Sequence, residues 1–121
     1  MYDIADIASQ LGLLRLEDPA PAAGDYMRVL APFNQCMAGM IRFAGTTEWE
    51  RHPDDEFLYV VEGQVEVTIL AGGDTRRETL RPGLACVVPA GAWHKQRTPG
   101  GVTLIYITSA AGTDHSAAET P

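Results

Sequence analysis

The sequence predicts an all-β domain, a sandwich or barrel of short antiparallel strands, with a short helix before it. From Tyr26 onwards, short runs rich in β-branched and aromatic residues follow one another with turn residues between them. Runs such as 57–61 (FLYVV) and 85–88 (ACVV) are apolar on both faces, which indicates strands that are covered on both sides. No helical segment alternates with these strands, so a parallel α/β sheet is not expected.

The chain is expected to form one domain with three parts, an N-terminal helix and connection, a barrel and a flexible C-terminal tail, over 1–25, 26–109 and 110–121. Apolar residues at helical spacing from Ile4 to Leu14 predict an amphipathic helix, capped by Asp3, that lies against the barrel or a partner subunit. Residues 17–25 are rich in Pro, Ala and Gly and read as an irregular connection. The tail is small and polar, so we expect it to be frayed.

Turn signals separate the expected strands of the barrel. The sequence Ala71-Gly72-Gly73-Asp74 predicts a hairpin, and the Pro-Gly segments 81–83 and 89–91 predict two further turns. The strands themselves are expected over 26–31, 35–43, 46–52, 56–61, 64–70, 75–80, 84–88, 92–98 and 102–109.

Charge and composition restrict the partners. A formal net charge of -7 argues against binding to nucleic acid or to an anionic membrane surface and favours solubility. No apolar run is long enough for a transmembrane helix, and the acidic N-terminus lacks the basic start of an export signal, so we expect a cytoplasmic protein. Cys36 and Cys86 lie inside strand-like apolar runs and are expected to be free thiols rather than a disulfide.

Four side chains that can bind a metal ion are spaced so that they meet. Alternation along a strand places Glu50 and His52 on the same face. The turn at 53–55 returns Glu56 beside His52 on the next strand, and His94 follows a Pro-x-Gly turn on a third. Two imidazoles and two carboxylates that converge in this way suit a divalent metal such as Fe, Mn, Ni or Zn.

Each of these residues also has an ordinary structural explanation. His52 beside a proline is typical of a surface turn, and Glu56 is typical of a solvated strand end. His94 could be a packed surface ring beside Trp93. By alternation, Trp49 and Trp93 should point away from the neighbouring ligand candidates and contribute to packing.

The order and spacing of these residues resemble the two sequence motifs of the cupins. In the first motif, His52 matches the second histidine, Glu56 the glutamate and Gly63 the closing glycine, whereas Glu50 occupies the position of the first histidine. The second motif is matched by Gly83, Pro89, Gly91 and His94, and Thr98 stands in place of its final asparagine.

The resemblance covers residues 26–109 and implies a double-stranded β-helix, the cupin or jelly-roll barrel. It implies His52, Glu56 and His94 as metal ligands, with Glu50 as a ligand by position only. Gly63 and Gly91 are expected in backbone conformations that a Cβ would strain. Small cupins usually form dimers, so the resemblance also implies a homodimer.

Two functions are compatible with such a barrel. One is a metal-dependent enzyme of the dioxygenase, isomerase or lyase type that acts on a small molecule. The other is a non-catalytic ligand-binding protein whose metal site is degenerate or absent. Strand alternation further suggests ligand-contacting residues, although Arg42 is also typical of a solvated surface; the candidates are Arg42, Met40, Gln96 and Tyr106.

Overall fold

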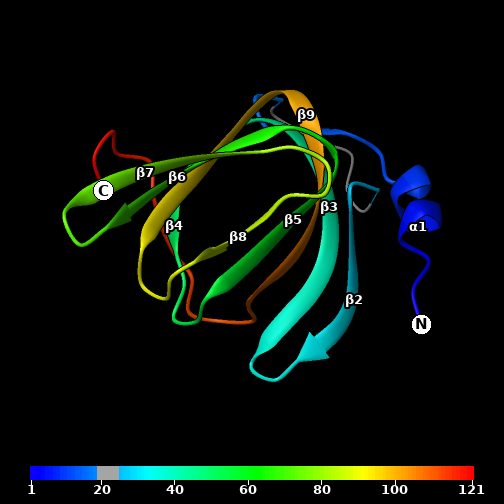
Figure 1. The fold of residues 1–121 in the computed structure, drawn as a ribbon, viewed down its shortest axis with the longest axis horizontal. Helices are drawn as coiled ribbons and strands as arrows, with labels where there is room; N and C mark the ends of the chain where they lie inside the picture. The colour runs from blue at the N-terminus through cyan, green and yellow to red at the C-terminus, as the bar shows by residue number, and fades with distance from the viewer. Residues whose placement is uncertain (19–24) are drawn as a thin grey trace.

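In a computed structural model, which describes residues 1–18 and 25–121, ten strands form one continuous sheet that curls into a barrel, with helix α1 outside it (Figure 1). The all-β prediction and the double-stranded β-helix architecture are confirmed. The elements are α1 (Ile4–Gln10), β1 (Leu14–Arg15), β2 (Met27–Phe33), β3 (Cys36–Thr46), β4 (Trp49–Arg51), β5 (Glu56–Gly63), β6 (Val65–Ala71), β7 (Asp74–Leu80), β8 (Ala85–Val88), β9 (Trp93–Ser109) and β10 (Asp114–Ser116).

Strand β9 connects the two sides of the barrel. Its first half pairs with β4 and β6, and its second half pairs with β3 and β5, all antiparallel. The sequence predicted two separate strands here, over 92–98 and 102–109, but the structure has one strand, whose pairing with β3 shifts register between Phe43 and Gly45. Gly101, at φ +95, supplies the left-handed backbone conformation within the strand, so no chain break is needed.

The core explains why several strands are apolar on both faces. One cluster, which includes Phe43, Leu58 and Leu104, fills the barrel interior. A second cluster lies outside the barrel, where Ile7, Ala8 and Leu11 of the N-terminal segment pack on Met40 of β3. Because α1 covers this outer face, β3 buries side chains in both directions.

Helix α1 is shorter than its apolar spacing predicted. The Asp3 carboxylate caps its start by accepting a hydrogen bond from the Asp6 N–H at 3.0 Å. The helix ends at Gln10, and Leu14–Arg15 pair with β3 as the parallel strand β1 instead of continuing the helix. Tertiary pairing with the barrel therefore overrides the helical spacing of Leu14. No helix in the described residues is both long enough and apolar enough to cross a membrane.

Part of the C-terminal segment expected to be frayed lies in the sheet. Strand β10 pairs antiparallel with β4, with Asp114 opposite Arg51 and Ser116 opposite Trp49. The Trp49 indole N–H also donates a hydrogen bond to the Glu119 carbonyl at 3.2 Å. Without the C-terminal segment, one edge of β4 and the adjacent Trp49 side chain would be uncovered, and the segment covers both.

Candidate metal site and ligand cavity

Backbone contacts hold together the two sequence stretches that carry the candidate ligands. The Gly91 N–H donates to the His52 carbonyl at 2.8 Å, and the Ala90 N–H donates to Asp55 Oδ1 at 2.8 Å. Gly91 adopts φ +76 and Gly63 φ +77, which confirms that both turns use the conformation favoured by glycine. The turn before β9 thereby places His94 directly opposite Glu50 in the β4–β9 pair.

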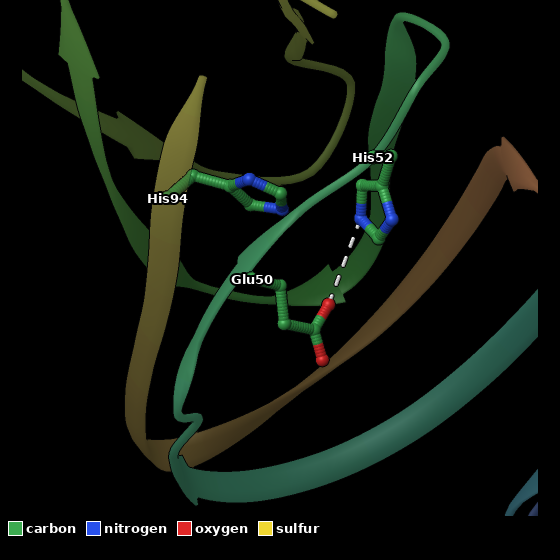
Figure 2. Close-up of side chains that lie close together, drawn as sticks. All are labelled: Glu50, His52 and His94. Atoms are coloured by element: carbon green, nitrogen blue, oxygen red, sulfur yellow. Dashed lines mark ion pairs between the residues drawn. The ribbon is translucent and has the colours of Figure 1, made fainter. Parts of the chain in front are cut away.

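The four predicted ligands lie in one cluster. The Nε2 atom of His94 is 3.1 Å from Glu56 Oε1, and the Nε2 atom of His52 is 3.3 Å from Glu56 Oε2. His52 Nε2 is also 3.6 Å from Glu50 Oε2. Figure 2 shows Glu50, His52 and His94 turned toward one another from β4, the residue after it and β9. The structure thus brings together all four residues that the spacing selected.

The polar atoms of this cluster fit a metal ion. His52 Nε2, Glu56 Oε1 and His94 Nε2 are buried, and their polar contacts among the described residues are with one another and with Glu50. Buried ligand atoms that converge in this way, with no other protein group between them, fit an ion held among them. Ligand atoms of Glu50, His52 and His94 all lie within 4.8 Å of one another. Imidazole and carboxylate donors suit a divalent transition metal.

The second nitrogen of each imidazole is held by a neighbour. His94 Nδ1 lies 3.2 Å from the Ala92 carbonyl, which can only accept, so the proton of neutral His94 is on Nδ1. His52 Nδ1 lies 2.8 Å from the Thr113 hydroxyl. The Thr113 hydroxyl can accept a hydrogen bond from Nδ1–H of His52, and in that tautomer both Nε2 lone pairs face the cluster, as metal binding requires. Thr113 lies in the tail, and nothing in the sequence pattern selected it.

The two carboxylates differ in their electrostatic surroundings. Burial alone would raise the pKa of Glu56, but the facing imidazoles of His52 and His94 outweigh burial and lower that pKa to about 2. Burial and the nearby Glu56 charge raise the pKa of Glu50. Burial opposes protonation of His94, but Glu56 outweighs it and raises the His94 pKa. His115 adds a further contact that the sequence did not suggest, with Nδ1 at 3.6 Å from Glu50 Oε1.

A cavity of about 330 Å³ opens beside the cluster. Glu50 and Glu56 line it together with Gln96 and Tyr106, as expected for these two ligand-contact candidates. The remaining lining residues were not predicted; they are Leu16, Met27, Ile41, Phe43, Thr47, Leu58, Leu104 and Thr108. The Tyr106 hydroxyl lies over Gly39 of β3, where a Cβ would overlap it.

The structure does not place Met40 and Arg42 in this cavity, which corrects the expectation for both. Ile41 and Phe43 line the cavity, so their neighbours on β3 point to the outside of the barrel. Met40 is fully buried against α1, and Arg42 Nη1 donates to the Leu11 carbonyl at 3.3 Å. A strand that is apolar on both faces does not reveal in its sequence which face is the interior.

The fold is similar to those of solved cupin structures. A cupin-2 domain protein from Shewanella frigidimarina matches with a TM-score of 0.68 and 22% identity, over 89% of this chain and 93% of its own. Hydroquinone 1,2-dioxygenase from Sphingomonas sp. TTNP3, solved with 4-hydroxybenzoate bound, matches with a TM-score of 0.62 and 19% identity, over 75% of this chain and 69% of its own. An oxalate oxidase in complex with glycolate matches with a TM-score of 0.58 and 24% identity, over 67% of this chain and 46% of its own.

Sequence comparison supplies the family. No curated protein matches the chain with significance. The profile of the cupin domain matches residues 40–109, which is more than half of the chain and includes both motifs. The chain therefore belongs to the cupin family.

Proposed function

We propose that the protein binds a divalent metal through His52, Glu56 and His94, with Glu50 as the fourth ligand, and acts as a metal-dependent enzyme on a small molecule. The observation that carries this proposal is the convergence of buried imidazole nitrogens and carboxylate oxygens beside a cavity, with ligand atoms of Glu50, His52 and His94 all within 4.8 Å of one another. The fold is shared with a hydroquinone 1,2-dioxygenase and an oxalate oxidase, and by this fold-level analogy we favour oxygen chemistry within the wider proposal of a dioxygenase, isomerase or lyase.

The metal we propose is Fe, Mn, Ni or Zn. Imidazole suits Fe, Ni and Zn, and two carboxylates shift the preference toward the harder ions Mn and Fe(II). When bound, such a metal supplies Lewis-acid chemistry or activates oxygen.

The residues of the chain have separable roles in this proposal. Glu56, with a pKa of about 2, is ionised and holds both imidazoles in place. Glu50 is the more exposed of the two carboxylates, and because its pKa is raised, a metal that binds it displaces a proton from it. We assign Tyr106, which lines the cavity, to contact the ligand.

A non-catalytic, ligand-binding cupin is the second candidate. The observation that favours it is Glu50, which stands where the cupin motif has a histidine and is partly exposed. The two candidate functions differ in whether the metal-loaded protein converts a bound small molecule to product.

The test is an assay of metal-loaded protein against chelator-treated protein. Oxygen uptake and product formation are followed over a panel of catechols, thiols and keto acids. Metal-dependent turnover of at least one compound, lost in His94→Ala, is expected for the enzyme. Saturable ligand binding without turnover by the metal-loaded protein would support the binding protein and contradict the enzyme.

We also propose a homodimer in the cytoplasm. Strand β2 pairs only with β3 in the described part of the chain and exposes Met27, Val29 and Phe33. An edge strand with exposed apolar side chains is a typical pairing surface. Light scattering at micromolar concentration is expected to give the mass of a dimer, and a monomer mass would contradict this proposal.

A further inference from the structure

We propose that the cavity beside the cluster selects a small, uncharged, mostly apolar molecule that carries a hydroxyl group at the end nearest to Gln96 and Thr108. This inference rests on the proposed function, because it assumes that the cavity beside the metal ligands is the ligand site. Three observations support it. The cavity wall is largely apolar, the nearby Lys and Arg side chains point away from the cavity, and two polar atoms of lining residues lack hydrogen-bond partners in the described chain.

The cavity wall is largely apolar. Phe43, Leu58 and Leu104 are buried members of the barrel core that also line the cavity. Three less buried apolar residues continue this surface; they are Leu16, Met27 and Ile41. At about 330 Å³ the cavity is at the lower end of the range of ligand sites, so the molecule must be small.

No Lys or Arg side chain lines the cavity in the described residues. Alternation along β9 turns Lys95 outward, where its ammonium lies 4.7 Å from the centre of the Trp49 ring. Arg51 lies 4.6 Å from the centre of the Trp93 ring, and Arg42 contacts the Leu11 carbonyl outside the barrel. A buried anion needs a paired charge or several donors, and the cavity wall offers no cation to pair with one.

The ligand set adds no attraction for an anion. Glu50 and Glu56 bring two negative charges to the site, so their carboxylates formally offset the charge of a divalent ion. A dianion in this apolar cavity would therefore lie beside a metal and two carboxylates whose formal charges sum to zero. An uncharged molecule avoids the desolvation cost that such a dianion would meet.

Two polar atoms mark one end of the ligand. Gln96 Oε1 and Thr108 Oγ1 are buried and lack hydrogen-bond partners in the described chain. Gln96 lies two positions after His94 on the same face of β9, and the register of β5 with β9 places Thr108 beside Glu56. An amide oxygen only accepts hydrogen bonds, so it requires a donor such as a hydroxyl group. The hydroxyl end of the ligand thus lies toward the metal ligands.

Three probes of one shape test this inference by calorimetry, on metal-loaded and on metal-free protein. They are 4-methylphenol, 4-methylbenzoate and p-xylene, which present a hydroxyl, a carboxylate or a methyl group on the same ring, with oxalate as a fourth, compact dianion. We expect 4-methylphenol to bind at least about tenfold more tightly than each of the other three, as the cost of an unpaired buried group implies. Tighter binding of 4-methylbenzoate or oxalate, or no saturable binding of any probe, would overturn the inference.

Variants of two glutamines test where the hydroxyl group binds, and metal content distinguishes this inference from the proposed metal-dependent function. Gln96→Leu should weaken 4-methylphenol binding about tenfold and leave p-xylene binding nearly unchanged, whereas Gln64→Leu, at an exposed glutamine in the β5–β6 turn, should change neither. Equal loss of both probes in Gln96→Leu would contradict the hydroxyl contact. A protein that takes up no metal but keeps the preference for 4-methylphenol refutes the metal-dependent function and retains this inference.

Discussion

Glu50 and Glu56 carry the same functional group but are prepared for different tasks. Glu56 lies between two imidazoles and is held ionised, with a pKa of about 2. Glu50 faces the cavity, and burial together with the Glu56 charge raises its pKa. Since the pKa values of the two carboxylates are shifted in opposite directions, Glu56 is ionised without a metal, whereas Glu50 gives up a proton when a metal binds it.

The raised pKa values of His94 and Glu50 predict that metal affinity rises with pH. A metal ligand must be deprotonated, so metal binding displaces the protons that these two groups hold at low pH. Glu56 adds nothing to this dependence above its pKa of about 2. Metal titrations between about pH 5 and 8 should show increasing affinity with proton release, and Glu50→Gln should release fewer protons. An affinity independent of pH over this range would be incompatible with these ligands.

The sequence was sufficient to select the candidate ligands that the structure brings together, but not the residues around them. His52, Glu56 and His94 follow from motif spacing, and Gln96 follows from alternation with His94 on one strand. Met40 and Arg42 were misplaced because β3 is apolar on both faces, and only the docking of α1 decides which face is outside. Thr113 contacts His52 across 61 positions of sequence, and no local pattern encodes such a contact.

At the scale of elements, β10 makes the C-terminal segment part of the site. Strand β10 pairs with β4 and begins one residue after Thr113, whose hydroxyl contacts His52. His115, on β10, contacts Glu50. We predict that Thr113→Val weakens metal binding by about 10- to 100-fold, because His52 loses the partner that orients its ring. Thr113→Ser keeps the hydroxyl and is the matched control in the same metal titration. Equal affinity of Thr113→Val and Thr113→Ser would exclude an orienting role for the hydroxyl.

Helix α1 and β3 allow a test of the reassigned Met40. We predict that Met40→Ala lowers the free energy of unfolding by about 2–5 kcal/mol, because a fully buried side chain is lost beneath the helix. The folded variant should bind 4-methylphenol as the parent does. Met27→Ala is the matched contrast, since Met27 is exposed and lines the cavity. It should lower the free energy of unfolding by about 0.5 kcal/mol or less and should weaken the binding of 4-methylphenol. Weaker 4-methylphenol binding in Met40→Ala, with normal binding in Met27→Ala, would indicate that Met40 rather than Met27 contacts the ligand.

For the whole molecule, the candidate site links separate parts of the barrel. Glu50 comes from β4, Glu56 opens β5 and His94 lies on β9, so a bound metal would join three strands. We predict that a metal at about 100 times its dissociation constant stabilises the fold by about 2.7 kcal/mol. Thermal unfolding should then shift upward by roughly 10 °C relative to chelator-treated protein. No shift at a saturating metal concentration would show that no ion is held between these strands.

The central claim, that these side chains form a metal centre, is tested most directly by the metal content of protein purified without chelator. Mass spectrometry of the parent protein should find about one Fe, Mn, Ni or Zn ion per chain. His94→Ala and Glu56→Gln should contain none after the same preparation, whereas Glu62→Gln, at an exposed glutamate of the same strand as Glu56, should keep its metal. Parent protein that is free of metal, and stays so after incubation with each of these ions, would contradict the claim.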